Sequence, residues 1–115
     1  MYQTGYAEVL ADSGAASRSH ERRALEHAIA LLSSAEAQGR RSREAVEALY
    51  FTERLWQVLL DDLASPENAL PDELRANLIS IGIWMLKEVE RIRLEESDDF
   101  RGLIEICTNI RDGLA

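Results

Sequence analysis

The chain has 115 residues, of which 46% are apolar and 30% are charged, as expected for one globular domain with one modest core. Its net charge of −8 repels phosphate backbones, which argues against direct nucleic-acid binding. The single cysteine cannot form an internal disulfide, and no basic residue precedes Arg18, so neither an oxidising compartment nor a signal peptide is indicated. We therefore expect a cytoplasmic protein.

The first segment, residues 1–12, is predicted to be a helical arm that docks on the rest of the protein or on a partner. Tyr2, Tyr6 and Val9 follow the helical spacing i, i+4 and i+7. Gly5 lowers the stability of such a helix by about 1 kcal/mol relative to alanine.

The next two segments, residues 15–38 and 43–64, are predicted to be long helices. The first has a narrow apolar stripe rich in alanine, which would let another helix approach closely, and Gly39 ends it. Ser42 is the expected N-cap of the second helix, whose apolar surface is broader. The stripe of the first helix consists of Ala24, Leu25, Ala28, Ile29, Leu32 and Ala35, and that of the second contains Val46, Leu49, Trp56, Leu60 and Leu63.

The predicted helix at residues 71–94 contains the most apolar stretch of the chain, LISIGIWML, at residues 78–86. Pro71 is expected in the first helical turn, where its missing N–H costs nothing. A helix that is apolar on nearly every side belongs in the middle of a core or in a membrane. Nine helical residues span only about 13 Å, too little to cross a bilayer core of about 30 Å. We therefore predict that this helix is the buried axis of the protein and does not insert into a membrane. One of its faces, on the side of Ile83 and Trp84, is expected to be covered only when a partner is present.

The last predicted helix covers residues 98–112, with Ser97 as its N-cap and Gly113 after its end. The sequence shows neither strand alternation nor a repeat of 20–50 residues. Short loops favour antiparallel neighbours. The sequence thus predicts a single all-α domain over residues 1–115, a small antiparallel bundle of about four helices with the N-terminal arm added.

No catalytic or metal-binding motif is recognisable in the sequence. His20 and His27 lie seven residues apart, about 10.5 Å along a helix, which is too far to share a metal ion easily. Cys107 falls on the inner face of its helix, so a buried and unreactive thiol is expected. Acidic groups at residues 61–62 and 95–99 are explained by helix capping and solubility. We predict no enzyme activity, no catalytic residue, no metal site and no cofactor.

Large apolar side chains remain as the candidate functional feature. Small helical proteins with wide apolar faces often take a partner helix into a groove, and aromatic residues dominate many interfaces. The alternative is that each of these side chains simply fills the core. The candidate partner-binding residues are Tyr50, Phe51, Trp56, Leu60, Ile83 and Trp84.

One stretch of the sequence resembles a known family. Residues 49–93, LYFTERLWQVLLDDLASPENALPDELRANLISIGIWMLKEVERIR, are similar to the flagellar biosynthesis regulator FlaF of alphaproteobacteria. The opening MYQTGYAEVLADS and the closing SDDFRGLIEICTNIRDGL also resemble that family, so the resemblance covers essentially the whole chain.

The resemblance implies a cytoplasmic factor of flagellum biogenesis that binds flagellin as a secretion chaperone and promotes flagellin synthesis and export. It also implies FlbT as a second partner. The alternative is a post-transcriptional regulator of flagellin expression that acts with FlbT on the transcript or on translation. For flagellin binding, we expect a groove lined by the helix at residues 46–63 and by the helix at residues 71–94. The sequence leaves open which flagellin segment is bound and whether the protein is a monomer or a dimer.

Overall fold

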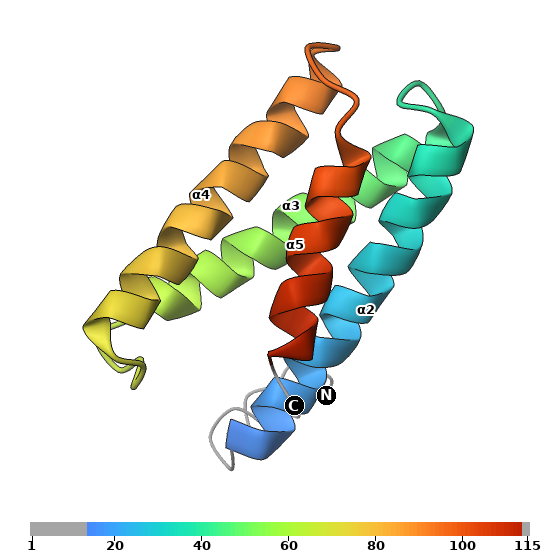
Figure 1. Ribbon diagram of the computed structural model, residues 1–115. Helices are drawn as coiled ribbons and strands as arrows, with labels where there is room; N and C mark the ends of the chain where they lie inside the picture. Colours follow the sequence, from blue (N-terminus) through green and yellow to red (C-terminus); the bar gives the residue numbers. More distant parts are fainter. Residues whose placement is uncertain (1–13, 114–115) are drawn as a thin grey trace.

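The computed structural model describes residues 14–113, with side chains from residue 18 onward, and this part of the chain forms four α-helices (Figure 1). No strand occurs among residues 14–113, and the predicted all-α fold is confirmed. The predicted arm at residues 1–12 lies outside the described residues. The helices are α2 (Gly14–Gln38), α3 (Arg43–Ala64), α4 (Asp72–Arg93) and α5 (Phe100–Asp112).

The helices are arranged in the spatial order α5, α2, α3, α4. The closest packing joins α2 to α5, α2 to α3, and α3 to α4. In Figure 1, α5 lies in front of α3 and beside α2, α3 crosses behind, and α4 lies on the other side of α3. Successive helices run in opposite directions along the chain. As a result, α4 sits at one edge of the bundle and is attached to it mainly through α3.

The core lies where one face each of α2, α3 and α5 meets the second half of α4. The predicted stripe of α2 is confirmed at its centre, because Leu25, Ala28, Leu32 and Ala35 are all fully buried. Trp56 of α3 is 1% exposed and is the largest fully buried side chain. The remaining buried apolar residues are Ala45, Ala48, Leu49 and Leu63 of α3, Met85, Val89 and Ile92 of α4, and Phe100, Leu103, Ile104 and Cys107 of α5.

Helix α4 is not the buried axis that the sequence predicts. No residue between positions 72 and 81 is buried, and between positions 78 and 86 only Gly82 and Met85 are. Ile83 and Trp84 remain 45% and 41% exposed. The prediction is wrong because a helix that is apolar all round needs neighbours on every side. In the described part of the chain, α3 is the one close neighbour of α4, so only one face of α4 is covered.

Local signals set the helix ends, with two differences from the predicted caps. Ser42 caps α3 as predicted, since its hydroxyl accepts a hydrogen bond from the Ala45 N–H at 3.0 Å. Helix α5 begins at Phe100 and is capped by Asp99, whose carboxylate accepts from the Gly102 N–H at 2.9 Å. Asp99 takes the place predicted for Ser97 because α5 begins at Phe100, two residues later than predicted, and Ser97 instead donates its hydroxyl to Glu88 of α4. Similarly, Pro71 occupies the N-cap position of α4 and precedes its first helical turn.

Glu88 is a buried acidic side chain that fixes the end of α4 to the loop that follows. Its carboxylate accepts hydrogen bonds from the Arg91 guanidinium at 2.8 Å and from the Ser97 hydroxyl. A buried carboxylate is tolerated when it is paired and hydrogen-bonded in this way. The Ser97 hydroxyl also accepts from the Asp99 N–H at 3.0 Å, so the contact continues into the cap of α5.

The contact between α3 and α4 is closest at Gly82. A Cβ atom placed on Gly82 would lie 2.6 Å from Cδ2 of Leu60 and 3.2 Å from Cε3 of Trp56. No side chain fits there unless Leu60 moves. The absence of a side chain at position 82 therefore sets how near the two helices can approach.

We expect Gly82→Ala to lower the free energy of unfolding by about 1 kcal/mol, measured by urea denaturation. The cost of overpacking, about 1–3 kcal/mol, exceeds the gain of about 1 kcal/mol in helix propensity. Ser80→Ala is the matched control. Ser80 is exposed on the same helix, so this variant should show only a gain in helix propensity and no overpacking. The double variant Gly82→Ala/Leu60→Ala should lose less stability than the sum of the two single variants, because Leu60→Ala removes the side chain that crowds the new Cβ atom. A Gly82→Ala protein at least as stable as wild type would contradict this account of the contact.

We expect Glu88→Ala to lower the free energy of unfolding by about 1–3 kcal/mol, because it leaves the hydrogen-bonding groups of Arg91 and Ser97 without their acceptor. Glu96→Ala removes an exposed carboxylate eight residues later and should change stability by less than about 0.5 kcal/mol. Thermal unfolding of the two variants side by side measures the difference, and equal midpoints would show that Glu88 does not anchor the loop.

Candidate partner-binding surface

Large apolar side chains are exposed along α4 and the turn before it. Leu74 is 45% exposed, and Ile83 and Trp84 are exposed to a similar degree. Leu70, in the turn before α4, is also exposed. Leu70, Leu74 and Leu78 follow each other at intervals of four residues, the spacing that places side chains on one flank of a helix. We call these three residues the apolar wall of α4, and α3 is the one close helical neighbour of α4 in the described residues.

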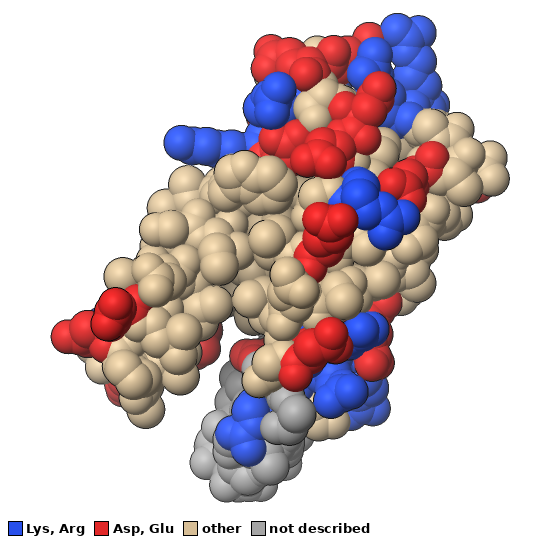
Figure 2. Space-filling model, in the orientation of Figure 1, with Lys and Arg blue, Asp and Glu red and all other residues tan. Residues whose placement is uncertain are grey.

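The apolar wall of α4 borders a cavity of about 110 Å³ at the end of the bundle. Figure 2 shows this face hollowed between the uncharged surface of α4 and the rest of the molecule. The cavity lies where parts of all four helices approach one another, and we call it the four-helix pocket. It is lined by Glu21 and Leu25 of α2, Trp56, Leu59, Asp62 and Leu63 of α3, Leu70 and Leu78 at α4, and Ile110 of α5.

Two carboxylates, Glu21 and Asp62, are the charged groups that line the four-helix pocket. Burial raises the pKa of Glu21, the negative charge of Asp62 raises it further, and the positive charge of Arg18 opposes the rise. Asp62 accepts a hydrogen bond from the Asn68 side-chain amide at 3.2 Å. An apolar cavity with an acidic lining favours a ligand that combines an apolar group with a positive charge.

Two of the predicted partner-binding residues belong to the interior. Trp56 is in the core, where it forms part of the floor of the four-helix pocket. Leu60 is half-buried and packs under Gly82 of α4. Both residues therefore lie beneath the exposed residues of α4, and Trp56 is almost inaccessible to a partner.

The other four predicted residues lie on different faces. Tyr50 is 57% exposed on α3, and its hydroxyl accepts a hydrogen bond from Arg54 at 3.3 Å. Phe51 is half-buried and packs edge-on against His27 of α2, with ring centroids 4.7 Å apart. Ile83 and Trp84 are on α4. The structure therefore does not bring the six predicted residues together into one groove.

Sequence reasoning missed most residues of the four-helix pocket. Leu78 lies in the apolar stretch at residues 78–86 and Trp56 is a predicted partner-binding residue, but neither signal indicates a pocket. Glu21, Asp62 and Ile110 are far apart in the sequence and come together only through the packing of α2, α3 and α5. No local pattern marks such a group of residues.

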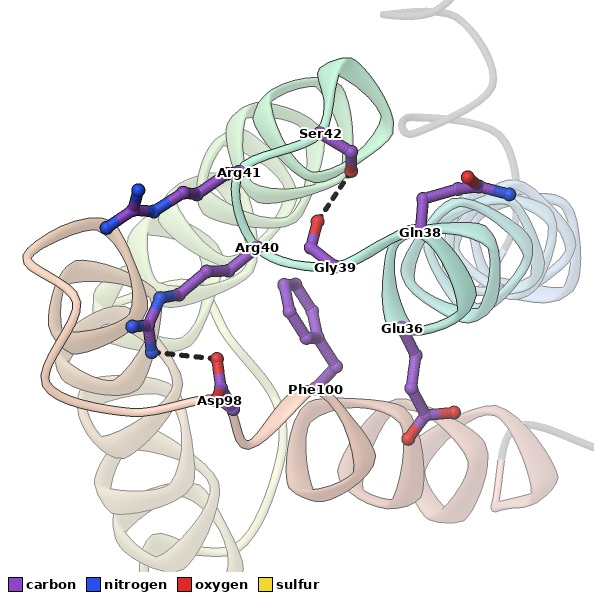
Figure 3. Close-up of a pocket in the computed structure, with 8 residues that line it drawn as sticks. All are labelled: Glu36, Gln38, Gly39, Arg40, Arg41, Ser42, Asp98 and Phe100. Atoms are coloured by element: carbon purple, nitrogen blue, oxygen red, sulfur yellow. Dashed lines mark hydrogen bonds and ion pairs between the residues drawn. The ribbon is translucent and has the colours of Figure 1, made fainter.

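The opposite end of the bundle is polar and its charges are paired with one another. A depression of about 660 Å³ there is lined by the turn between α2 and α3 and by the start of α5. Figure 3 shows Arg40 bound to Asp98, at 2.9 Å, and Phe100 pointing toward Gly39. Arg41 pairs with Glu95 at 2.9 Å in the same region. These ion pairs hold the two loops together. Because the charged groups are already paired, this depression is a weaker candidate for ligand binding than the four-helix pocket.

The described residues provide little basis for catalysis. Burial raises the pKa of the Cys107 thiol to about 11, so the thiol is protonated at neutral pH and is a poor nucleophile. The indole of Trp56 opposes this rise, and its N–H has no hydrogen-bond acceptor with good geometry.

Within residues 14–113, no group of three metal-binding side chains is close enough together to hold a metal ion. None of the four helices is long and apolar enough to span a bilayer.

The described residues form a small all-helical protein with an exposed apolar surface beside a pocket that two carboxylates line. A family model described as "Flagellar protein FlaF" matches residues 2–114. The chain belongs to the FlaF family, and it is therefore a flagellar protein. No curated protein and no solved structure matches the chain in the corresponding comparisons.

We expect Glu21→Gln to stabilise the protein at neutral pH. Because the pKa of Glu21 is raised above its ordinary value of 4.5, the folded protein holds this proton more tightly than the unfolded chain. The resulting stability is fully present below pH 4.5 and is lost as the pH rises through the folded-state pKa. At pH 7 the ionised carboxylate destabilises the fold, and its removal should raise the free energy of unfolding by about 0.5 kcal/mol or less, since Glu21 is partly exposed.

Unfolding measured from pH 3.5 to pH 7.5 tests this expectation. The advantage of Glu21→Gln over wild type should grow as the pH rises from 4.5 and then level off. Asp61→Asn removes an equal charge at an exposed position outside the pocket and is the control for the loss of charge alone. A constant difference between Glu21→Gln and wild type at all pH values would contradict the raised pKa.

Proposed function

We propose that this FlaF protein binds flagellin in the cytoplasm as a secretion chaperone and so promotes flagellin synthesis and export. The observation that carries the proposal is the set of exposed apolar side chains along α4, which lies beside the four-helix pocket and has α3 as its one close helical neighbour in the described residues. Membership of a flagellar family supports flagellin as the partner.

Helical segments at the ends of flagellin pair with one another only in the filament, so their apolar faces need cover before export. An amphipathic helix binds a groove through apolar side chains at i, i+3, i+4 and i+7. Apolar residues of α4 and α5 would supply two walls for such a helix, and α3 would supply the floor. The walls contain Leu74, Leu78 and Ile81 on α4 and Ile106 and Ile110 on α5.

The net charge of −8 supports a protein partner over a nucleic acid. Negative charges around an apolar site speed encounter with a positively charged partner and discourage wrong partners more than they add affinity. Figure 2 shows that charged side chains gather away from the uncharged surface of α4, mainly at the end where the α4–α5 loop lies. The apolar surface thus remains accessible between charged regions.

The second candidate function is post-transcriptional regulation of flagellin expression together with FlbT. The arginines of the turn between α2 and α3 favour an indirect route, because Arg40 and Arg41 are paired with Asp98 and Glu95 and so are already neutralised. Regulation would then proceed through a protein contact with FlbT. Titration of the flagellin transcript leader with the purified protein tests this, and saturable, salt-sensitive binding would instead favour direct action on RNA.

We expect the double variant Leu74→Ala/Trp84→Ala to weaken flagellin binding by tenfold or more, measured by calorimetry with monomeric flagellin. Truncation of an aromatic interface residue often costs about 2 kcal/mol or more, and about 1.4 kcal/mol corresponds to a factor of ten. Both side chains are exposed, so the fold should change little in stability. Trp56→Ala is unsuitable for this test, because emptying a core site of that size costs about 3–5 kcal/mol.

Val58→Ala is the matched control for this experiment. Val58 is 50% exposed on α3 and lines neither the four-helix pocket nor the wall of α4. It should leave the affinity for flagellin unchanged. Unaltered binding by the folded Leu74→Ala/Trp84→Ala protein would show that flagellin uses another surface.

A further inference from the structure

We propose that the four-helix pocket receives one bulky apolar side chain of the bound flagellin helix, together with a lysine or arginine about one helical turn away whose cation lies between Glu21 and Asp62. The inference rests on the proposed flagellin binding and specifies which kind of flagellin segment is held. It assigns the pocket as the selective part of the surface, and the apolar wall of α4 as the less selective part.

The size and lining of the pocket fit a single apolar side chain. Its volume of about 110 Å³ is several times the roughly 30 Å³ that one water molecule occupies in the liquid, and it approaches the roughly 150 Å³ of an apolar cavity that binds benzene. Apart from two carboxylates, the pocket is lined by apolar side chains and by the ring of Trp56. Leu70 is both part of this lining and exposed, so the pocket is open to the surface of the protein.

The two carboxylates would bind the positive charge of the partner. Glu21 and Asp62 are close enough for the charge of Asp62 to disfavour ionisation of Glu21, and Glu21 is itself partly buried. Arg18 opposes the rise in the pKa of Glu21, but its effect is smaller than that of burial and that of Asp62. A cation from the partner, placed beside both groups, would relieve the repulsion, so the site is complementary to a positive charge.

The positions of the groups limit the spacing on the partner. Glu21 is on α2 and Asp62 is on α3, and both line the same small cavity as Leu78 and Ile110. An apolar side chain in the cavity and a cation beside its carboxylates must come from nearby points on the partner. On a helix, residues three or four apart satisfy this condition. A flagellin segment with a lysine or arginine at that distance from a leucine, isoleucine, methionine or phenylalanine is therefore the expected occupant.

Site-specific photocrosslinking identifies the occupant directly. A benzoylphenylalanine at position 70, at the edge of the pocket, is irradiated in the full-length protein with and without flagellin, and the crosslinked peptides are identified by mass spectrometry. We expect attachment to a flagellin helix within one turn of a lysine or arginine. The same probe at position 58, outside the pocket, should give no such product. Attachment instead to a second copy of the chain or to its own residues 1–13, with flagellin present, would overturn the inference.

The role of the carboxylates is tested by comparing the flagellin affinities of the Glu21→Gln and Asp61→Asn variants. Glu21→Gln should weaken flagellin binding by about 5- to 10-fold at low salt and reduce its salt dependence, because it removes one of the two charges at the pocket. Asp61→Asn removes an equal charge next to Asp62 but outside the pocket, and it should have little effect. Since Glu21→Gln is expected to be the more stable protein, weaker binding cannot result from partial unfolding.

The outcomes separate this inference from the proposed function. If wild-type protein does not bind flagellin at all, the proposed function fails and the inference fails with it. If wild-type protein binds flagellin, the Leu74→Ala/Trp84→Ala protein binds weakly, and Glu21→Gln binds as wild type does, the surface is correct and only the assignment of the pocket is wrong.

Discussion

The close contact of α4 with α3 at Gly82 determines which surface the protein presents. Because position 82 has no side chain, α4 packs closely on Trp56 and Leu60, and one face of its second half, which carries Met85, Val89 and Ile92, is buried. The first half of α4 has no second close neighbour among the described helices, so Leu74 stays exposed and Leu78 lines the four-helix pocket. A larger residue at position 82 would move α4 away from α3, and this would change the shape of the four-helix pocket. The packing that stabilises the fold is thus the packing that shapes the candidate site.

The two ends of α4 are held very differently. At its C-terminal end, Arg93 pairs with Glu53 of α3 at 2.9 Å, and the buried Glu88 binds the next loop. Its N-terminal end follows Pro71 and has no side-chain cap, and the next ten residues bury no side chain. Segments with few buried contacts open at a lower free energy than the rest of a protein. The half of α4 that forms the apolar wall is therefore the half best able to adjust to a partner helix, while the other half keeps its place.

The sequence predicted the elements of this fold more successfully than their arrangement. Helix ends depend on local chemistry, such as the Ser42 cap and the positive φ of Gly39, and the predicted ends fall within two residues of those observed. Burial depends on neighbours that are distant in the chain. Trp84 lies on the most apolar stretch of the chain and is 41% exposed, whereas Trp56, on a less apolar stretch, is in the core. The four-helix pocket was unpredictable for the same reason, because each of the four helices contributes only part of its lining.

The features that lower the stability of this fold gather at the apolar end of the bundle. The four-helix pocket opens to the surface there, leucines are exposed, and both burial and the charge of Asp62 raise the pKa of Glu21. At the opposite end, the charges of Arg40, Arg41, Asp98 and Glu95 are matched in pairs. The proposed partner helix, with an apolar face and a nearby cation, would cover the leucines and offset the repulsion between the two carboxylates. Part of its binding free energy would then come from interactions that are unfavourable in the free protein.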